Sequence, residues 1–307
     1  MYRRMLVPLD GSKLAEMAFV YAKELAGRLH MDLVLFHVCQ DGESERCAMQ
    51  RVYVQRAAEM VEDQSRGVQR DSGMEPGDRE VGARAEVAVG HSAEEILRYA
   101  EENRIDLILM TSHGESGVTR WALGSVADKV LRASTVPVWL VPARVGPEIV
   151  YDRCPNRTML VPLDVSELAE CVLPHVEALT KQRGTEVMEV VLIGVVEPLP
   201  TPSQYAHDVV CWEEHVAHST RINERYLARV RGRLERAGLR VRAEVLLGRP
   251  ADEIVRYANT NPCNMVVMST HGRSGLDQSS YGCVTGRVLQ DATRPVLLIR
   301  PTVPIKA

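Results

Sequence analysis

The stretch Met110-Thr-Ser-His-Gly-Glu-Ser-Gly117 decides the fold, and the chain carries it twice, again as Met268-Ser-Thr-His-Gly-Arg-Ser-Gly275. In both copies nine residues separate the Gly after His from a later Gly, which is Gly124 in one copy and Gly282 in the other. An apolar, strand-like run precedes each stretch and a helical pattern follows it. A strand, a glycine-rich loop and a helix N-terminus together bind phosphate, because backbone amides converge there. The sequence therefore predicts one phosphate-binding loop in each half.

The repetition extends far beyond these loops. Met5-Leu-Val-Pro-Leu-Asp10 matches Met159-Leu-Val-Pro-Leu-Asp164, and later in each half Val136-Pro-Val138 is matched by Arg294-Pro-Val296. The period is about half of the chain, which indicates a duplicated domain and not a short-period solenoid. We expect one domain over residues 1–144 and a second over 155–307, joined by a linker over 143–156 that contains two prolines and a glycine.

Each half alternates between short apolar runs and helical patterns. In the first half the predicted strands cover 4–9, 32–38, 83–89, 106–110 and 137–141, and the predicted helices cover 13–28, 46–69, 92–103 and 125–133. Ser92 is the expected N-cap of the third helix, with Glu95 closing a capping box. The second half repeats the plan, with a longer charged helix over 206–237. This order predicts an α/β fold of two tandem, doubly wound, five-stranded and mainly parallel sheets, Rossmann-like in type.

The composition limits the class of partner. The chain has 307 residues, is 45% hydrophobic and carries a net charge of -4, so it has no general attraction to nucleic acid or to an anionic membrane. No apolar run reaches the roughly 20 residues that span a bilayer. The seven cysteines are scattered and form no Cys-x-x-Cys pair. We therefore expect a cytoplasmic protein with reduced, mostly buried thiols, without a metal site and with neither a nucleic acid nor a membrane as partner.

Particular residues have both a structural and a binding interpretation. Gly124 and Ser125 open a predicted helix, whose first amides lack internal partners and lie at the positive end of the helix dipole. Ser125 is expected both to cap this helix and to donate its hydroxyl to a phosphate oxygen. Asp10 and Asp164 follow the first strand of each half, where ligands bind in doubly wound sheets. Each carboxylate either accepts bonds from ribose or base, holds a metal-bound water, or caps the next helix.

Together these motifs resemble the universal stress protein family. The resemblance rests on Val-Pro-Leu-Asp, His-Gly-x-Ser-Gly, the Gly-Ser-Val-Ala helix start and the late Val-Pro-Val, and it covers nearly the whole chain twice, as in tandem members of that family. It implies a five-stranded fold that binds adenine nucleotides. Many members bind ATP through Gly-x2-Gly-x9-Gly-(Ser/Thr), whereas others lack the motif and bind none. Here the first Gly of that motif falls on Thr111 and Ser269, and Cys283 replaces the final Ser/Thr.

Carried over residue by residue, the resemblance implies ATP, bound with Mg²⁺, as the ligand. The implied nucleotide-binding positions are Pro8, Leu9, Asp10, Val38, Met110, Thr111, His113, Gly114, Gly117, Arg120, Gly124, Ser125 and Val126 in the first half, and Asp164, Val195, Met268, His271, Gly272, Arg273, Gly275, Gly282 and Cys283 in the second. We expect tighter binding in the first half, because Cys283 replaces Ser125 and Gln278 replaces Arg120. The resemblance also implies that the last strands of the two halves pair as a pseudo-dimer within one chain, with a homodimer as a further possibility.

We compare three classes of function with this pattern. The leading interpretation is a stress-response or regulatory protein that binds ATP and hydrolyses it slowly at most. No Gly-x4-Gly-Lys-(Ser/Thr) loop is present, and no catalytic residue is identified; His113 and His271 are expected to hold their loops by hydrogen bonds. The alternative is an ATP-independent interaction protein whose glycine loops only shape the fold. A nucleotidyl-transfer enzyme is disfavoured, because neither His-x-Gly-His nor Ser-Gly-Gly-x-Asp-Ser occurs.

Overall fold

The computed structural model divides into two compact units, Met1–Asp152 and Arg153–Ala307, and each is described by itself. It describes residues 2–40, 44–73, 79–113, 123–142, 157–198, 206–272 and 281–301, without the side chains of 44 and 206–212. The predicted linker over 143–156 lies outside these ranges.

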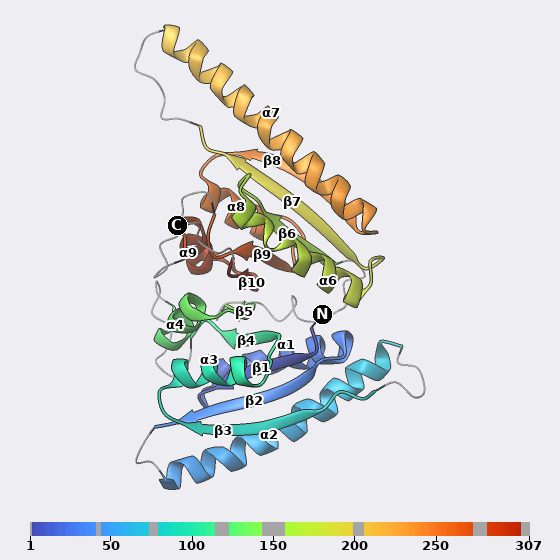
Figure 1. Ribbon diagram of the computed structural model, residues 1–307, viewed down its shortest axis with the longest axis vertical. Coiled ribbons are helices and arrows are strands. Elements are labelled where there is room, and N and C mark those ends of the chain that lie inside the picture. Colours follow the sequence, from blue (N-terminus) through green and yellow to red (C-terminus); the bar gives the residue numbers. More distant parts are fainter. Residues whose placement is uncertain are drawn as a thin grey trace. The chain divides into compact units, whose positions relative to one another are not determined.

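The first unit alternates strands and helices as the sequence predicts (Figure 1). Its elements are β1 (Arg4–Leu9), α1 (Lys13–Leu29), β2 (Asp32–Cys39), α2 (Ser44–Asp71), β3 (Ala83–Val89), α3 (Ser92–Glu102), β4 (Leu107–Thr111), α4 (Ser125–Ala133) and β5 (Val138–Val141). The strand order is β3-β2-β1-β4-β5, and all of these neighbours pair in parallel. The chain therefore winds outward from β1 in one direction and then crosses to β4 on its other side.

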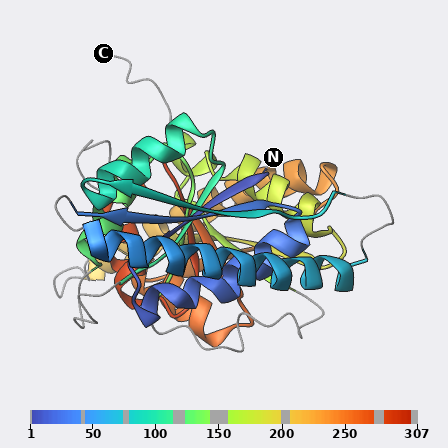
Figure 2. The same cartoon turned by 90° about the horizontal axis from the view of Figure 1, so that it is seen from below.

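Helices cover both faces of this sheet. Figure 2 shows α1 and α2, in blue, on one face and α3, in teal, on the other. Every residue of β4 and β5 is buried, which explains why both strands read as continuous apolar runs. The core of the unit lies between these layers and includes Leu6, Leu33 and Ile108.

The second unit repeats the plan with one change. Its elements are β6 (Arg157–Pro162), α5 (Glu167–Glu170), α6 (Leu173–Arg183), β7 (Met188–Val196), α7 (Ala206–Arg236), β8 (Arg240–Leu247), α8 (Pro250–Thr260), β9 (Met265–Ser269), α9 (Cys283–Asp291) and β10 (Val296–Ile299). The strand order is β8-β7-β6-β9-β10, again parallel. Where the first unit has the single helix α1, the second unit has two shorter helices, α5 and α6. The helix is interrupted there because Pro174 has no N–H to donate to the carbonyl of Glu170. The predicted parallel α/β fold is confirmed.

Two predicted details at element ends are wrong. The N-cap of α3 is His91, without a side-chain cap, and Ser92 is the first helical residue. The N–H of Glu95 bonds to the carbonyl of His91, while the Glu95 carboxylate pairs with Arg98, so the predicted capping box does not form. At the fourth strand, Asp106 precedes the strand instead of starting it.

Candidate functional site

A cavity of about 560 Å³ opens where the strand order of the first unit reverses. In doubly wound sheets ligands bind outside the carboxyl ends of the strands at this switch point, here between β1 and β4. The cavity is lined by the ends of β1, β2 and β4, by the first turn of α4 and by the start of α2. Its size falls in the range of small-molecule sites.

The described first-unit candidates all line this cavity. They are Pro8, Leu9, Asp10, Val38, Met110, Thr111, His113, Gly124, Ser125 and Val126. The remaining three, Gly114, Gly117 and Arg120, lie outside the described residues. Residues that are distant in sequence are thus brought to one opening by the topology.

The start of α4 presents backbone amides to the cavity. Gly124 is the N-cap, with φ -57° and ψ 145°, so the capping role predicted for Ser125 is wrong: Ser125 is already the first helical residue. The N–H of Gly124 donates to the carbonyl of Ser112 at 2.8 Å, and the first intrahelical bond runs from Asp128 N–H to the Gly124 carbonyl at 2.9 Å. The helix ladder therefore does not use the N–H groups between them, at Ser125, Val126 and Ala127, all of which line the cavity.

Asp10 lies on the β1 side of the cavity. Its Oδ1 accepts from the N–H of Ser12 at 2.9 Å, and Ser12 in turn caps α1 by accepting from Ala15 N–H at 3.1 Å. Asp10 therefore shapes the turn while Ser12, and not Asp10, caps the helix. Asp10 is also one of the residues that line the cavity, and a carboxylate can accept hydrogen bonds from a ligand.

Hydroxyl groups hold the loop after β4. Thr111 Oγ1 donates to the carbonyl of His113 at 2.7 Å, and Ser112 Oγ bonds Nδ1 of His113 at 3.0 Å. These bonds agree with the predicted loop-holding role of His113. Its Nε2 atom is buried and has no hydrogen-bond partner within the described part of the chain. A buried polar atom without a partner is costly, so a ligand acceptor or donor at this point would relieve the cost.

Sequence reasoning named Val38 at the end of β2 but missed its neighbour His37 and the contribution of α2. His37 lines the cavity, and its Nδ1 lies 2.8 Å from the carbonyl of Leu9. Because a carbonyl only accepts, Nδ1 is the donor of this hydrogen bond. Arg46 and Gln50 line the cavity from α2. The implied role of Val38 is the signal that could have indicated His37 beside it in β2, but nothing local indicates that α2 reaches the same opening.

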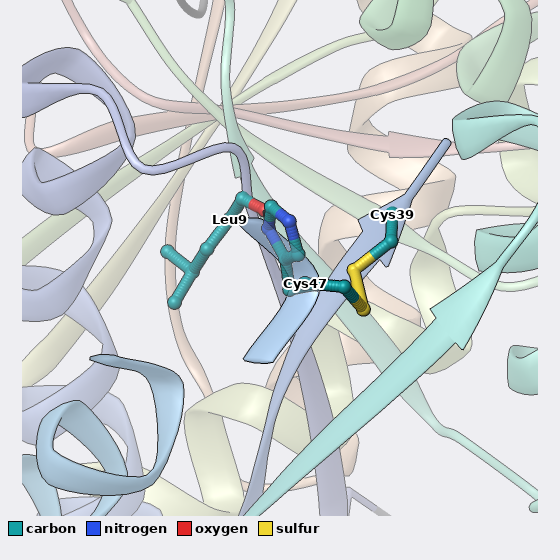
Figure 3. Close-up of a disulfide and its surroundings, with 4 residues drawn as sticks. Leu9, Cys39 and Cys47 are labelled. Carbon is teal, nitrogen blue, oxygen red and sulfur yellow. A yellow bond between two sulfur atoms is a disulfide. The ribbon is translucent and has the colours of Figure 1, made fainter. Parts of the chain in front are cut away.

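The prediction that the cysteines are reduced is wrong for one pair. Cys39, at the end of β2, and Cys47, in α2, form a disulfide with Cα atoms 5.7 Å apart. Figure 3 shows this bond close to Leu9 at the end of β1. The start of α2 lies beside the end of β2, which brings the two thiols together; their separation of 8 in the sequence allows this contact but does not require it. Cys171, Cys263 and Cys283 are free.

The second unit reproduces the loop geometry. Ser269 Oγ donates to the carbonyl of His271 at 2.5 Å, Thr270 Oγ1 bonds Nδ1 of His271 at 2.9 Å, and Gly282 N–H donates to the Thr270 carbonyl at 2.8 Å. Gly282 caps α9, which begins at Cys283. Met268 lies in β9 and Val195 in β7. Arg273 and Gly275 lie outside the described residues.

The aspartate of the second unit lies against the loop after β9. Asp164 accepts from the N–H of Ser166 at 3.2 Å and from its hydroxyl at 2.5 Å. Its Oδ2 lies so close to the Cα of Gly272 that an added Cβ would collide with it. A carboxylate thus borders the loop that would receive phosphate, which is unfavourable for an anion.

Within the described residues, no group of three His, Cys, Asp or Glu side chains could hold a metal ion. Across the same residues, no helix combines the length and apolar character needed to cross a membrane.

Comparison with known proteins gives the family. The sequence model of one family, described as "Universal stress protein family", matches residues 1–142 and matches again at residues 155–300. A universal stress protein of Methanocaldococcus jannaschii is 26% identical over 144 residues, which cover 47% of this chain and 82% of that protein. One of Bacillus subtilis is 29% identical over 147 residues, covering 46% and 99%. The crystal structure of a universal stress protein from Archaeoglobus fulgidus has a TM-score of 0.63 at 20% identity, covering 97% and 98% of the two chains, and shares the fold. The chain, matched by the family twice along its length, belongs to the universal stress protein family.

Proposed function

We propose that this protein is a stress-response or regulatory protein that binds ATP with Mg²⁺ in its first unit and hydrolyses it slowly at most. The observation that carries the proposal is the cavity at the β1–β4 switch point, which is lined both by Asp10 and by the residues of α4 whose N–H groups the helix ladder does not use. Amides at a helix N-terminus suit phosphate, and a carboxylate suits ribose hydroxyls. The family membership supports a nucleotide as the ligand class.

The residues present fit the nucleotide. The N–H groups of Ser125 and Val126 would hold phosphate oxygens, and the buried Nε2 of His113 would gain a partner. The carboxylate of Asp10 would accept hydrogen bonds from the ribose hydroxyls, and the backbone of Val38 would lie beside them. Mg²⁺ would come bound to the phosphates, because this cation is usually held through substrate phosphates and keeps several of its waters. The cation would neutralise the charge of the phosphates, and the protein's own groups would bind and orient the nucleotide.

The test is a pair of matched substitutions. Ser125→Asp places a carboxylate at the first residue of α4, where an acid suits the helix dipole but repels phosphate. Cys283→Asp makes the same change at the first residue of α9. We expect Ser125→Asp to weaken Mg-ATP binding by roughly tenfold or more, about 1.4 kcal/mol, in isothermal titration calorimetry. Cys283→Asp should leave this binding unchanged.

Equal losses in the two variants would contradict the assignment to the first unit. No heat of binding with the wild-type chain, together with no rise of its melting temperature in Mg-ATP, would contradict the function itself and favour the ATP-independent interaction protein.

Other predictions rest on the sequence alone. The domain limits 1–144 and 155–307, the cytoplasmic location, the pseudo-dimer within the chain and the homodimer stay predictions.

A further inference from the structure

The disulfide between Cys39 and Cys47 is part of the cavity wall. Both cysteines line the cavity, Cys39 from the end of β2 and Cys47 from the start of α2. The Cys39 carbonyl accepts from Gly90 N–H at 2.9 Å, so the strand end is also fixed to the end of β3. The bond thus joins a rigid strand end to the start of a helix (Figure 3).

The start of α2 carries other parts of the wall. Arg46 and Gln50 line the cavity on either side of Cys47. The Gln50 amide lies against Gly11, where an added Cβ would be 3.3 Å from Nε2. The position of this helix start therefore sets the shape of the cavity next to β1 and β2.

The rest of α2 is held without the disulfide. Tyr53 donates its hydroxyl to Glu16 of α1 at 2.8 Å, and burial together with this bond raises the pKa of Tyr53, so it stays a donor. Farther along, Gln69 Oε1 accepts from Val81 N–H at 3.1 Å. Breaking the disulfide would release the turns before Tyr53 and leave the body of the helix packed.

We propose that the Cys39–Cys47 disulfide is a redox-controlled clamp on the ligand cavity: the oxidised clamp holds the start of α2 in the shape that binds nucleotide, and reduction loosens it. The inference rests on the proposed function, because the regulated ligand is the nucleotide of that site. A dithiol reductant supplies the two electrons. One of its thiolates attacks a sulfur of the bond, the resulting mixed disulfide is resolved by its second thiol, and Cys39 and Cys47 remain as thiols while the reductant leaves as a disulfide.

The second unit has no such clamp at the matching strand end. Pro8 pairs with Phe36, and Pro162 pairs with Ile193, so by register the position of Cys39 holds Val196. The effect of reduction is therefore assigned to the first unit. A cavity whose wall is already ordered binds its ligand more tightly than one whose wall must become ordered on binding. Redox-sensitive disulfides of this kind are also the ones that occur in reducing compartments.

The experiment measures Mg-ATP affinity of the full chain, oxidised and then reduced with dithiothreitol, while mass spectrometry after alkylation counts the thiols. We expect reduction to free Cys39 and Cys47 and to weaken binding by about tenfold. Cys47→Ser should bind like the reduced wild type with or without reductant. Cys171→Ser is the thiol control and should respond to reductant as the wild type does; burial raises the pKa of Cys171 to about 12, so this thiol is poorly reactive.

The outcomes separate the two proposals. Equal affinity before and after verified reduction, or a redox response that persists in Cys47→Ser, overturns the clamp while the nucleotide site stands. A failure of air- or disulfide-treated protein to form the bond overturns it as well. Absence of Mg-ATP binding in both redox states overturns the proposed function and the clamp with it.

Discussion

At the scale of residues, the turn after the first strand of each unit requires one residue with a left-handed backbone conformation. Gly11 has a φ of +83°, and Val165, at the matching place between Asp and Ser, has a φ of +69°. Both turns let the aspartate accept from the N–H of the serine that caps the next helix. Glycine adopts this left-handed conformation without strain, whereas a β-branched residue does so at a cost. The second unit therefore forms the same turn although the branched side chain of Val165 makes this conformation strained.

Val165→Gly should stabilise the second unit. Removing the strain of a left-handed β-branched residue gains about 1–2 kcal/mol, and the extra freedom of glycine in the unfolded chain takes back about half of that. We expect a net gain of about 1 kcal/mol in the free energy of unfolding, measured as a higher urea midpoint. The matched control, Gly11→Val, should destabilise the first unit. A loss of stability in Val165→Gly would show that the valine side chain contributes more by packing than its backbone costs.

At the scale of elements, α1 and α2 pack closely because one glycine lets their backbones meet. A Cβ at Gly27 of α1 would lie 2.6 Å from the carbonyl oxygen of Ser65 and 2.7 Å from Cβ of Val68, both in α2. Ser65 is fully buried, and its hydroxyl donates to the carbonyl of Val61 at 2.6 Å. Since the first of these atoms is backbone, the helix itself would have to move.

Gly27→Ala should therefore destabilise the first unit by about 2 kcal/mol, since overpacking costs about 1–3 kcal/mol and exceeds the gain in helix propensity. Gly67→Ala is the matched control in α2, where an added Cβ meets nothing within 4 Å. This variant should stabilise by up to about 1 kcal/mol. Urea unfolding of both variants measures the difference, and a stabilising Gly27→Ala would refute the close approach.

Local sequence predicted the elements well, because each strand or helix carries its own pattern. The bounds of β1, β3 and α4 match the predictions. The start of β4 was harder to place, since the Asp106 carboxylate accepts from the N–H groups of Arg3 and Arg4, at 2.9 Å each, and this contact is tertiary. The contribution of α2 to the cavity could not be predicted for the same reason: its direction is set by packing on α1, and no residue near Cys47 signals it.

At the scale of the whole molecule, the duplicated pattern predicted two similar units but also where they differ. The register that gives Val196 the position of Cys39 also gives Gly194 the position of His37. A Cβ at Gly194 would lie 2.7 Å from Oδ1 of Asn223, so a side chain of α7 lies against β7 there. The sequence predicted weaker binding in the second unit from Cys283 and Gln278. The structure adds a difference that the sequence did not indicate, the side chain of Asn223 at the position that His37 holds in the first unit.

These differences predict one nucleotide for each chain. Titration of the full chain with Mg-ATP should give a stoichiometry close to one, because Asn223 lies against β7 at the position that His37 holds in the first unit, and the carboxylate of Asp164 borders Gly272, where it disfavours phosphate. Asp164→Asn removes that charge while it keeps an oxygen that can accept from Ser166. If the charge is the main obstacle, this variant should gain a second, weaker site in the same titration. A wild-type stoichiometry of two would contradict the argument, since both loops would then hold phosphate in spite of the carboxylate.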